Sequence, residues 1–315
     1  MISLELEVKE NFTNVISTFI ILGFPSSPPV RMLFFFIFLF MYILTIVENL
    51  FIIIIIYYSP KLHKPMYFFL GNLSFLETWY VTVTVPKLLS IFLNGNNTIT
   101  YVGCMCQLFF FLCLGCTECV LLTVMAFDRY VAICNPLHYQ TIMNWHICFI
   151  LALSTWLIGL AISLLKIYFI SKLTFCHSVI INHFYCDVSP ILNLACTDMT
   201  LTELVDFILA LVILLVPLLL TCLSYLCILS AILQIRNSTG RKKAFSTCGS
   251  HLVVVIMLYS TTLFMYARPS KAQSINSNKL VSVVYTVVTP FLNPIIYCLR
   301  NREVKAAIEK LVYRN

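Results

Sequence analysis

The sequence predicts an all-α membrane protein, a seven-transmembrane helix bundle that ends in a short amphipathic C-terminal helix. Of its 315 residues, 60% are hydrophobic and only 10% are charged, whereas a soluble domain carries about 25% charged residues. The apolar residues gather in runs long enough to cross the hydrocarbon core of a bilayer, which takes about 20 residues. Lys and Arg lie mostly between these runs, which indicates membrane topology and argues against a nucleic-acid-binding surface.

Seven stretches meet this length requirement, and each is expected to form one transmembrane helix. Their expected bounds, in chain order, are Met32–Tyr57, Pro65–Phe92, Tyr101–Cys134, Ile147–Ile170, Leu204–Ile235, Ala244–Met265 and Leu280–Leu299. Pro86, Pro217, Pro290 and Pro294 lie inside these stretches. In a bundle, neighbouring helices and Ser or Thr side chains satisfy the carbonyl groups that a proline leaves free.

The basic residues orient the bundle with its N-terminus outside the cell. In that orientation the cytoplasmic side carries Lys61, Lys64, Arg129, Arg236, Arg241, Lys242, Lys243, Arg300, Arg302, Lys305, Lys310 and Arg314. The chain does not open with a basic segment and a long apolar core, so no cleavable signal peptide is expected. The expected organisation is one domain over residues 1–315: an extracellular N-terminus at 1–31, the bundle at 32–299 and a cytoplasmic amphipathic tail at 300–315.

Two Asn-X-Thr sequons fall on the side that this orientation places outside. Asn11 lies in the N-terminal segment and Asn96 in the first outer loop, so both are expected glycosylation sites. The sequons at Asn72 and Asn237 fall within a span and in the cytosol, so neither is expected to carry a glycan.

The tail after the last span has the pattern of an amphipathic helix. Val304, Ile308, Leu311 and Val312 follow at i, i+4, i+7 and i+8, with basic residues between them. Such a helix is expected to lie on the inner leaflet, and the alternative is a frayed basic tail.

Most of the 14 cysteines lie in apolar runs, where cysteine behaves as a small hydrophobic residue. Four lie at or beyond the outer end of the third span, namely Cys104, Cys176, Cys186 and Cys196. Disulfides are expected among them because this side is oxidising, and the sequence leaves three pairings open. His183 and Asp187 flank Cys186, which raises the alternative of a metal site. No metal site is predicted, because a disulfide-bonded cysteine is not a thiolate ligand.

Four motifs at successive positions along the chain resemble one receptor family. PMYFFL opens the second span at Pro65–Leu70, and MAFDRYVAIC closes the third at Met125–Cys134. KAFSTC opens the sixth span at Lys243–Cys248, and NPIIY closes the seventh at Asn293–Tyr297. In this order they resemble the olfactory (odorant) receptors of the rhodopsin-like G-protein-coupled class. The outer third span has no cation for a carboxylate ligand, which is similar to the tetrapod-type group.

The resemblance implies a function that composition does not show. It implies a receptor for a small volatile molecule, a multi-pass protein of the plasma membrane in the cilia of olfactory sensory neurons. The implied partners are an odorant, a stimulatory heterotrimeric G protein that raises cyclic AMP, and membrane lipid. The resemblance also implies the disulfides Cys104–Cys186 and Cys176–Cys196. No nucleic-acid partner, enzymatic activity or cofactor is expected.

Three residues depart from the usual pattern of this family. Glu48 stands where a glycine usually precedes Asn49, Glu77 replaces an aspartate, and Ser260 replaces a common glycine. Glu48 adds a carboxyl within the membrane, where it must be neutral, paired or hydrated. The alternative for the whole chain is therefore a receptor of this fold that reaches the cell surface poorly.

A ligand pocket is expected in the outer half of the bundle. On the third span, Phe111, Leu112, Gly115, Cys116 and Cys119 form one stripe in which small residues leave space between larger ones. The stripes predicted to complete the lining are Leu209, Ile213, Tyr259, Thr262, Tyr266, Val283 and Thr286. The pocket is expected to be mostly apolar, and because no Asp lies near Phe111 a neutral, moderately hydrophobic odorant is predicted. The alternative is that these stripes serve helix packing alone.

Two carboxyl groups, those of Glu77 and Glu118, are expected near the bilayer midplane, where buried charge is costly and indicates function. With Asn49, Ser74 and Asn293 they form a predicted site for a sodium ion or a shared proton that favours the inactive state. The sodium ion would be an allosteric modulator. The alternative is two protonated carboxyls that only form hydrogen bonds.

The cytoplasmic ends of the spans carry the predicted coupling residues. The hypothesis is that Asp128 pairs with Arg129 at rest, and that a ligand which separates spans three and six frees Arg129 for the G protein. The other residues assigned to activation or coupling are Tyr130, Tyr225, Lys242, Lys243, Asn293, Pro294 and Tyr297.

Two alternatives come from other functional classes. Intramembrane carboxyls also mark ion paths in transporters and channels, but this chain shows no internal repeat and an odd number of spans. No H-E-x-x-H, G-x-S-x-G or phosphate-loop pattern occurs, and the six histidines do not cluster at ligand spacing. An enzyme is therefore not predicted.

Overall fold

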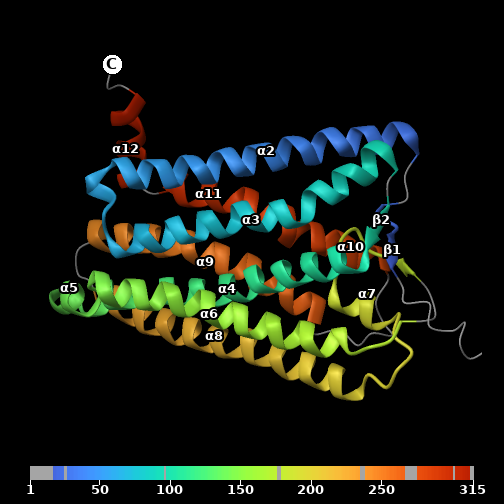
Figure 1. Cartoon of the computed structure of the whole chain (residues 1–315). Helices are drawn as coiled ribbons and strands as arrows, with labels where there is room; N and C mark the ends of the chain where they lie inside the picture. The colour runs from blue at the N-terminus through green and yellow to red at the C-terminus, as the bar shows by residue number, and fades with distance from the viewer. Residues whose placement is uncertain are drawn as a thin grey trace, which may run out of the picture.

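The computed structural model describes residues 17–24, 27–95, 97–175, 179–234, 238–266, 275–300 and 302–312. Within these ranges the side chains of 238–240, 242–247, 265–266, 275–278, 298–300, 302, 309 and 311–312 lie outside the description. The fold is the predicted bundle of long helices, which run side by side in Figure 1.

The bundle helices match the predicted spans closely. They are α2 (Pro28–Tyr58), α3 (Pro65–Asn94), α4 (Tyr101–Cys134), α6 (Trp145–Ser171), α8 (Thr200–Gln234) and α9 (Ser238–Tyr266). The seventh span consists of α10 (Ile275–Val283), the π-helical segment η4 (Val284–Val288) and α11 (Thr289–Arg300). Prolines lie inside α3, α8 and α11 without ending them, as expected inside a bundle.

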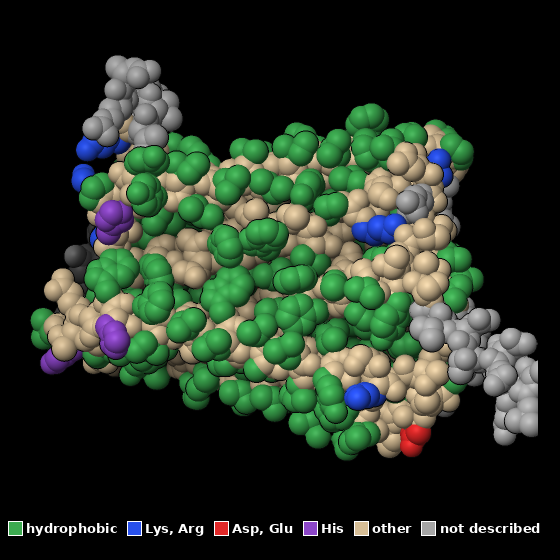
Figure 2. Space-filling model, in the orientation of Figure 1, with side chains coloured by type: hydrophobic (Ala, Val, Ile, Leu, Met, Phe, Trp, Pro, Cys, Tyr) green, Lys and Arg blue, Asp and Glu red, His purple; other side chains and the backbone are tan. Residues whose placement is uncertain are grey.

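The outer surface of the bundle is apolar along its length. Figure 2 shows hydrophobic side chains covering the flank, with Lys, Arg and His toward the two ends. Among the described residues, five helical segments have the length and composition to cross a membrane, and Cys248–Phe264 within α9 is a shorter apolar helix. The most deeply buried of the five is α4, which contacts α3, α6, α8 and α9 and is therefore the centre of the bundle.

A glycine permits close packing of α4 against α6. A Cβ atom added to Gly159 would collide with Thr117 Oγ1 and would lie 2.7 Å from the Cys113 carbonyl oxygen. Thr117 is fully buried and donates its hydroxyl to that same carbonyl over 2.7 Å. The backbones therefore approach each other closely only because residue 159 has no side chain.

A small sheet that the sequence did not predict covers the outer end of the bundle. Its strands are β1 (Thr18–Ile21), β2 (Thr98–Thr100) and β3 (Ile180–Ile181), in the order β2-β1-β3. β1 pairs antiparallel with β2 and parallel with β3, and Phe19 and Ile21 of β1 are fully buried. The sheet joins the N-terminal segment to the first and second outer loops (Figure 1).

The tail forms the predicted amphipathic helix, α12 (Arg302–Val312), which turns away from the bundle axis in Figure 1. Val304 and Ala307 are buried and Ile308 is half-buried, whereas the side chains of Leu311 and Val312 lie outside the description. Glu303 accepts hydrogen bonds from Lys64 Nζ at 2.7 Å and from the Tyr67 hydroxyl at 2.9 Å. These bonds tie α12 to the start of α3.

Candidate functional site

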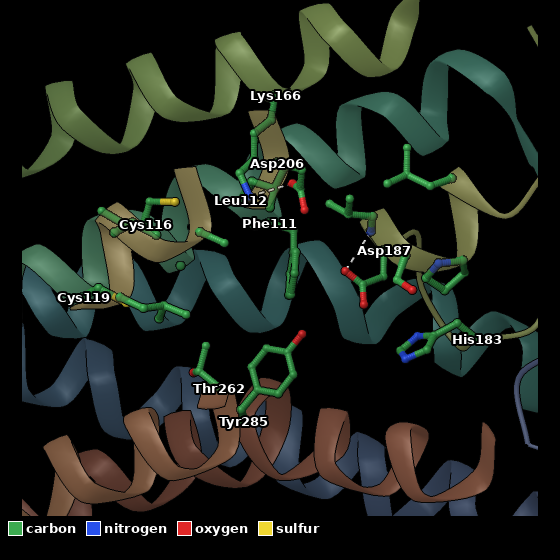
Figure 3. Close-up of a pocket in the computed structure, with 18 of the residues that line it drawn as sticks. Phe111, Leu112, Cys116, Cys119, Lys166, His183, Asp187, Asp206, Thr262 and Tyr285 are labelled. Atoms are coloured by element: carbon green, nitrogen blue, oxygen red, sulfur yellow. Dashed lines mark hydrogen bonds and ion pairs between the residues drawn. The ribbon is translucent and has the colours of Figure 1, made fainter. Parts of the chain in front are cut away.

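A cavity of about 540 Å³ lies in the outer half of the bundle, under the loop that joins α6 to α8. Its apolar wall comes from α4, α8 and α9 and consists of Phe111, Leu112, Cys116, Cys119, Ala210, Ile213, Leu214 and Leu258. Figure 3 shows Thr262 and Tyr285 on one side of Phe111, with Lys166 and Asp206 on the other. The size and lining are those of a site for a small, largely apolar ligand.

Several predicted ligand-binding residues line this cavity, namely Phe111, Leu112, Gly115, Cys116, Ile213 and Thr262. Gly115 leaves room, as expected from its small size. A Cβ atom there would lie 3.8 Å from the ring of Tyr80, which also lines the cavity.

Four other predicted residues, Leu209, Tyr259, Val283 and Thr286, lie outside the lining. Ala210 of α8 and Leu258 of α9 line the cavity in place of their predicted neighbours Leu209 and Tyr259. Each helix is therefore turned about its own axis relative to the orientation that the prediction assumed. In the seventh span Tyr285 faces the cavity, since the π-helical turn of η4 changes the residue spacing. The side chain of Tyr266 lies outside the described residues.

Charged residues line the outer part of the cavity, contrary to the prediction of a mostly apolar pocket. Lys166 Nζ of α6 lies 2.7 Å from Asp206 Oδ1 of α8, with side chains 3% and 18% exposed. Asp187 and Glu203 line the same part of the cavity. The pocket is therefore less apolar than expected. Lys166 and Asp206 each fall within a predicted span, and an intramembrane charge was the signal that could have identified them.

The loop between α6 and α8 closes the outer end of the cavity and is fixed to α4. Cys104 and Cys186 form a disulfide bond with their Cα atoms 5.6 Å apart. The Cys186 N–H donates to Gln107 Oε1 over 3.0 Å, which adds a second attachment to α4. The short helix α7 (Val188–Leu192) follows in this loop, and Val188 and Leu192 line the cavity.

Aromatic residues join this loop to the seventh span. The Tyr185 hydroxyl is hydrogen-bonded to the Tyr285 hydroxyl, and a His183 ring nitrogen lies 3.2 Å from Ser282 Oγ. The Phe111 ring lies 4.7 Å from the Tyr185 ring and 5.9 Å from the Tyr285 ring. The loop therefore contacts both α4 and the π-helical segment next to the cavity.

Two titratable groups of this loop are strongly affected by burial. Burial raises the pKa of Asp187 to about 6. The Val188 N–H donates a 2.8 Å hydrogen bond to Asp187 Oδ1, which partly opposes this rise. Burial and the nearby Lys279 ammonium lower the pKa of His183 to about 3. His183 is therefore neutral at pH 7, and Asp187 becomes protonated at mildly acidic pH.

The predicted polar cluster lies deeper in the bundle. Asn293 Nδ2 of α11 donates to Glu77 Oε1 of α3 at 2.5 Å, and Ser74 is buried nearby along α3. Asn49 Nδ2 donates to the Thr45 carbonyl at 3.0 Å. The side-chain oxygens of Asn49 and Asn293 are buried without a hydrogen-bond partner among the described residues. Glu118, the other predicted member, lines the cavity described above and interacts electrostatically with Glu77.

At the opposite end of the bundle, Asp128 and Arg129 lie side by side, with Oδ2 and Nη2 3.8 Å apart. Asp128 Oδ1 also accepts a 2.7 Å hydrogen bond from the Tyr139 hydroxyl of α5 (Tyr139–Ile142), an attachment that the sequence analysis missed.

Tyr225 is engaged with the sixth span. Its hydroxyl lies 2.6 Å from His251 Nδ1, which links α8 to α9. The Tyr297 hydroxyl is buried without a partner among the described residues. Tyr130 is partly buried on α4, Pro294 lies inside α11, and the side chains of Lys242 and Lys243 lie outside the description.

The remaining predicted sites fall wholly or partly outside the described residues. Asn11, Asn96 and Cys176 are not described. Cys196 is disulfide-bonded. Within the described part of the chain no group of His, Cys, Asp or Glu side chains has the arrangement of a metal site.

Comparison with known proteins identifies a consistent set of relatives. The family model described as olfactory receptor matches residues 38–315. Olfactory receptor 6B1 of Homo sapiens is 62% identical over 304 residues, covering 96% of this chain and 97% of the relative. Olfactory receptor 6B9 of Mus musculus is 55% identical and covers 96% of each chain. Olfactory receptor 226 of Rattus norvegicus is 53% identical over 97% of this chain and 94% of its own length.

Proposed function

The chain belongs to the olfactory receptor family of G-protein-coupled receptors, and on this premise we propose that it binds a small neutral odorant in the cavity under the outer loop. Odorant binding activates a stimulatory heterotrimeric G protein and raises cyclic AMP. The observation that carries this proposal is the cavity of about 540 Å³, which has an apolar wall from three helices and the Lys166–Asp206 ion pair in its outer part. As members of this family are receptors, the chain is a multi-pass membrane receptor and not an enzyme.

The lining favours a ligand with an apolar body and a hydrogen-bonding group. Leu112, Ile213 and Leu258 offer only apolar contact. The Lys166 ammonium has N–H groups beyond the one that Asp206 accepts, so it is able to donate to a ligand oxygen. A ligand with a net charge would compete with this pair instead of complementing it, so neutral molecules are favoured.

A panel of neutral, amine and carboxylate odorants tests the ligand class. The full-length receptor is expressed at the cell surface and cyclic AMP is measured as a function of concentration. Neutral members are expected to respond at the lowest concentrations, and loss of the response in cells without the stimulatory Gα subunit would support the coupling. A panel in which only amines or only carboxylates activate contradicts the proposed ligand class.

Receptor activation involves the ends of the helices away from the cavity. In the resting receptor Arg129 lies beside Asp128, and Tyr225 bonds to His251 of α9. Outward movement of α9 breaks the Tyr225–His251 link and exposes Arg129, with Tyr130, Pro294 and Tyr297, to the G protein. Lys242 and Lys243 at the start of α9 supply positive charge to that surface.

The polar cluster holds a sodium ion or a shared proton in the resting receptor. The unpartnered oxygens of Asn49 and Asn293 and the carboxyl of Glu77 are all acceptors, the ligand type that sodium takes. Ser74 and Glu118 complete the cluster, with Glu118 as the protonated acid, so that the negative charge of the cluster lies on Glu77. A Glu77→Gln variant is expected to lose the dependence of its basal cyclic AMP on sodium concentration, and an unchanged dependence contradicts the sodium site.

The proposed topology is one receptor domain over residues 1–315. Residues 1–31 are extracellular, residues 32–299 form the bundle with its loops, and residues 300–315 lie in the cytoplasm. Glycans are carried by Asn11 in the N-terminal segment and by Asn96 in the first outer loop. The receptor resides in the plasma membrane of sensory-neuron cilia, in contact with lipid along the apolar flank.

A further inference from the structure

Glu118 is a buried acid at the inner end of the ligand cavity. Its side chain is on α4, is 3% exposed and lines the cavity. Glu118 follows Phe111 by seven residues, or two helical turns, so both lie on the same side of α4. The Glu118 carboxyl is therefore about 10 Å further from the outer loop than Phe111.

This carboxyl makes no hydrogen bond to any of the described residues. Another acid, Glu77, interacts with it electrostatically, and between two carboxylates this interaction is repulsive. A carboxylate charge in an apolar interior without a cation beside it is costly, so the neutral acid is the favoured form. A neutral carboxyl has one O–H that needs an acceptor, and the cavity is where an acceptor has room to bind.

The ion pair occupies a different part of the same cavity. The Lys166 ammonium interacts electrostatically with Cys116, which lies about 200° around α4 from Glu118. Leu112 and Ile213 supply apolar side chains to the lining of this cavity. A ligand that reaches both positions therefore has a hydrogen-bonding group at each end and an apolar middle.

From this geometry we infer that Glu118 is the inner recognition group of the ligand site, and that its O–H donates to an oxygen at the inner end of a ligand with two polar ends. The inference rests on the proposed function. A ligand without that oxygen leaves the Glu118 O–H buried and unpaired, which weakens its binding.

Two series of straight-chain probes test this inference: C6–C10 primary alcohols and the α,ω-diols of the same lengths. Cyclic AMP is measured with surface-quantified wild-type receptor and with Glu118→Gln and Glu118→Leu. In the wild type, the best diol is expected to act at about a three- to ten-fold lower concentration than the alcohol of equal length. Gln keeps a donor, so E118Q should retain this ratio of the active concentration of the alcohol to that of the diol. E118L should bring it to one or below, because the second hydroxyl then meets an apolar side chain.

Glu48→Leu is the matched control, since it removes an intramembrane carboxyl on α2 that does not line the cavity. Its alcohol-to-diol ratio should equal that of the wild type. An E118L ratio equal to that of the wild type overturns the inference and leaves the proposed function intact, even if E118L alters basal activity. An E48L ratio that falls with that of E118L also overturns it. If no member of either series and no odorant of the panel activates the wild type, both the inference and the proposed function fail.

Discussion

The charged residues inside the bundle each have a definite place, and the Lys166–Asp206 pair is the clearest case. Its atoms lie 2.7 Å apart between α6 and α8, and the Lys166 side chain is almost fully buried. The pair lines the cavity and also joins two helices. Its contribution to stability and its proposed contribution to the ligand response are therefore separable by mutation.

Removing one partner is expected to cost more stability than removing both. Lys166→Met leaves the Asp206 carboxylate without its cation, at a cost of about 3–5 kcal/mol for a buried pair. The double variant Lys166→Met/Asp206→Leu should recover most of that loss and still respond weakly to polar odorants. Thermal unfolding of detergent-solubilised receptor measures the first effect and cyclic AMP the second.

The exposed Lys64–Glu303 pair, with side chains 53% and 48% exposed, provides the control. Lys64→Met should cost less than about 1 kcal/mol because solvent screens this pair. A Lys166→Met loss as small as that of the control would show that the cavity pair is not held in an apolar environment.

The Asp187 carboxyl is expected to make the stability of the receptor depend on pH. Its pKa is raised to about 6 in the folded receptor, against about 3.9 in an unfolded chain. Between about pH 4 and 6 the folded receptor therefore holds a proton that the unfolded chain has released. The stability that this proton contributes is complete below about pH 4 and is lost as the pH rises through 6. Between pH 5 and 7.4 the wild type should lose about 1 kcal/mol from this group.

Asp187→Asn should remove this slope and keep the cap of α7, since its side-chain oxygen is still able to accept from Val188 N–H. Asp187→Ala should remove both the pH dependence and the cap of α7. Thermal shift of purified receptor at the two pH values measures the difference, and equal slopes for wild type and Asp187→Asn would refute the assignment.

At the scale of whole elements, packing within the membrane depends on small residues where helices cross. Lipid chains are as apolar as the helix surfaces, so association comes from close contact and hydrogen bonding rather than from exclusion of water. The crossing of α4 and α6 at Gly159 shows this most directly, because any side chain there meets the backbone of α4.

Gly159→Ala is expected to destabilise the receptor by about 1–3 kcal/mol or more, since the added methyl group must displace α6 from α4. Gly71→Ala is the matched control, because its Cβ atom would have ordinary contact with Ile56 at 3.8 Å. The control substitution should be neutral or stabilising, as alanine favours a helix. Surface expression and thermal unfolding compare the two, and a Gly159→Ala receptor as stable as the control would contradict the close crossing.

At the scale of the whole molecule, the two ends of the bundle carry different groups of residues. The outer end is closed by the disulfide-bonded loop and the three-stranded sheet, directly above the cavity. The other end carries Asp128, Arg129 and the Tyr225–His251 link. In the proposed function, ligand recognition and G-protein coupling therefore lie on opposite sides of the membrane, and α4 connects the two ends of the bundle.

Epitope tags at the two termini test this topology. In intact cells an antibody should reach an N-terminal tag, and a C-terminal tag should be stained only after permeabilisation. Antibody staining of both tags in intact cells would contradict an odd number of membrane crossings. An internal control is a tag on a known plasma-membrane protein in the same cells.

The sequence by itself determined the membrane class, the positions of the helices and the family. Hydrophobic length is a local property, so the predicted third span, Tyr101–Cys134, has the same bounds as α4. The family motifs are short and local as well. The amphipathic tail could be recognised because one of its faces meets water, so its stripe contrasts with its surroundings.

Only the tertiary structure decided which side chains meet in the cavity. Inside a bilayer the lipid-facing and inward faces of a helix are both apolar, so the hydrophobic pattern does not mark the inward face as it does in water. The phase of α8 and the π-helical turn before Thr289 therefore selected Ala210 and Tyr285 over the expected Leu209 and Thr286. The pairing of Lys166 with Asp206 joins residues 40 positions apart, and the burial of Asp187 depends on the fold of a loop. Both arise from contacts between distant segments, which no local pattern specifies.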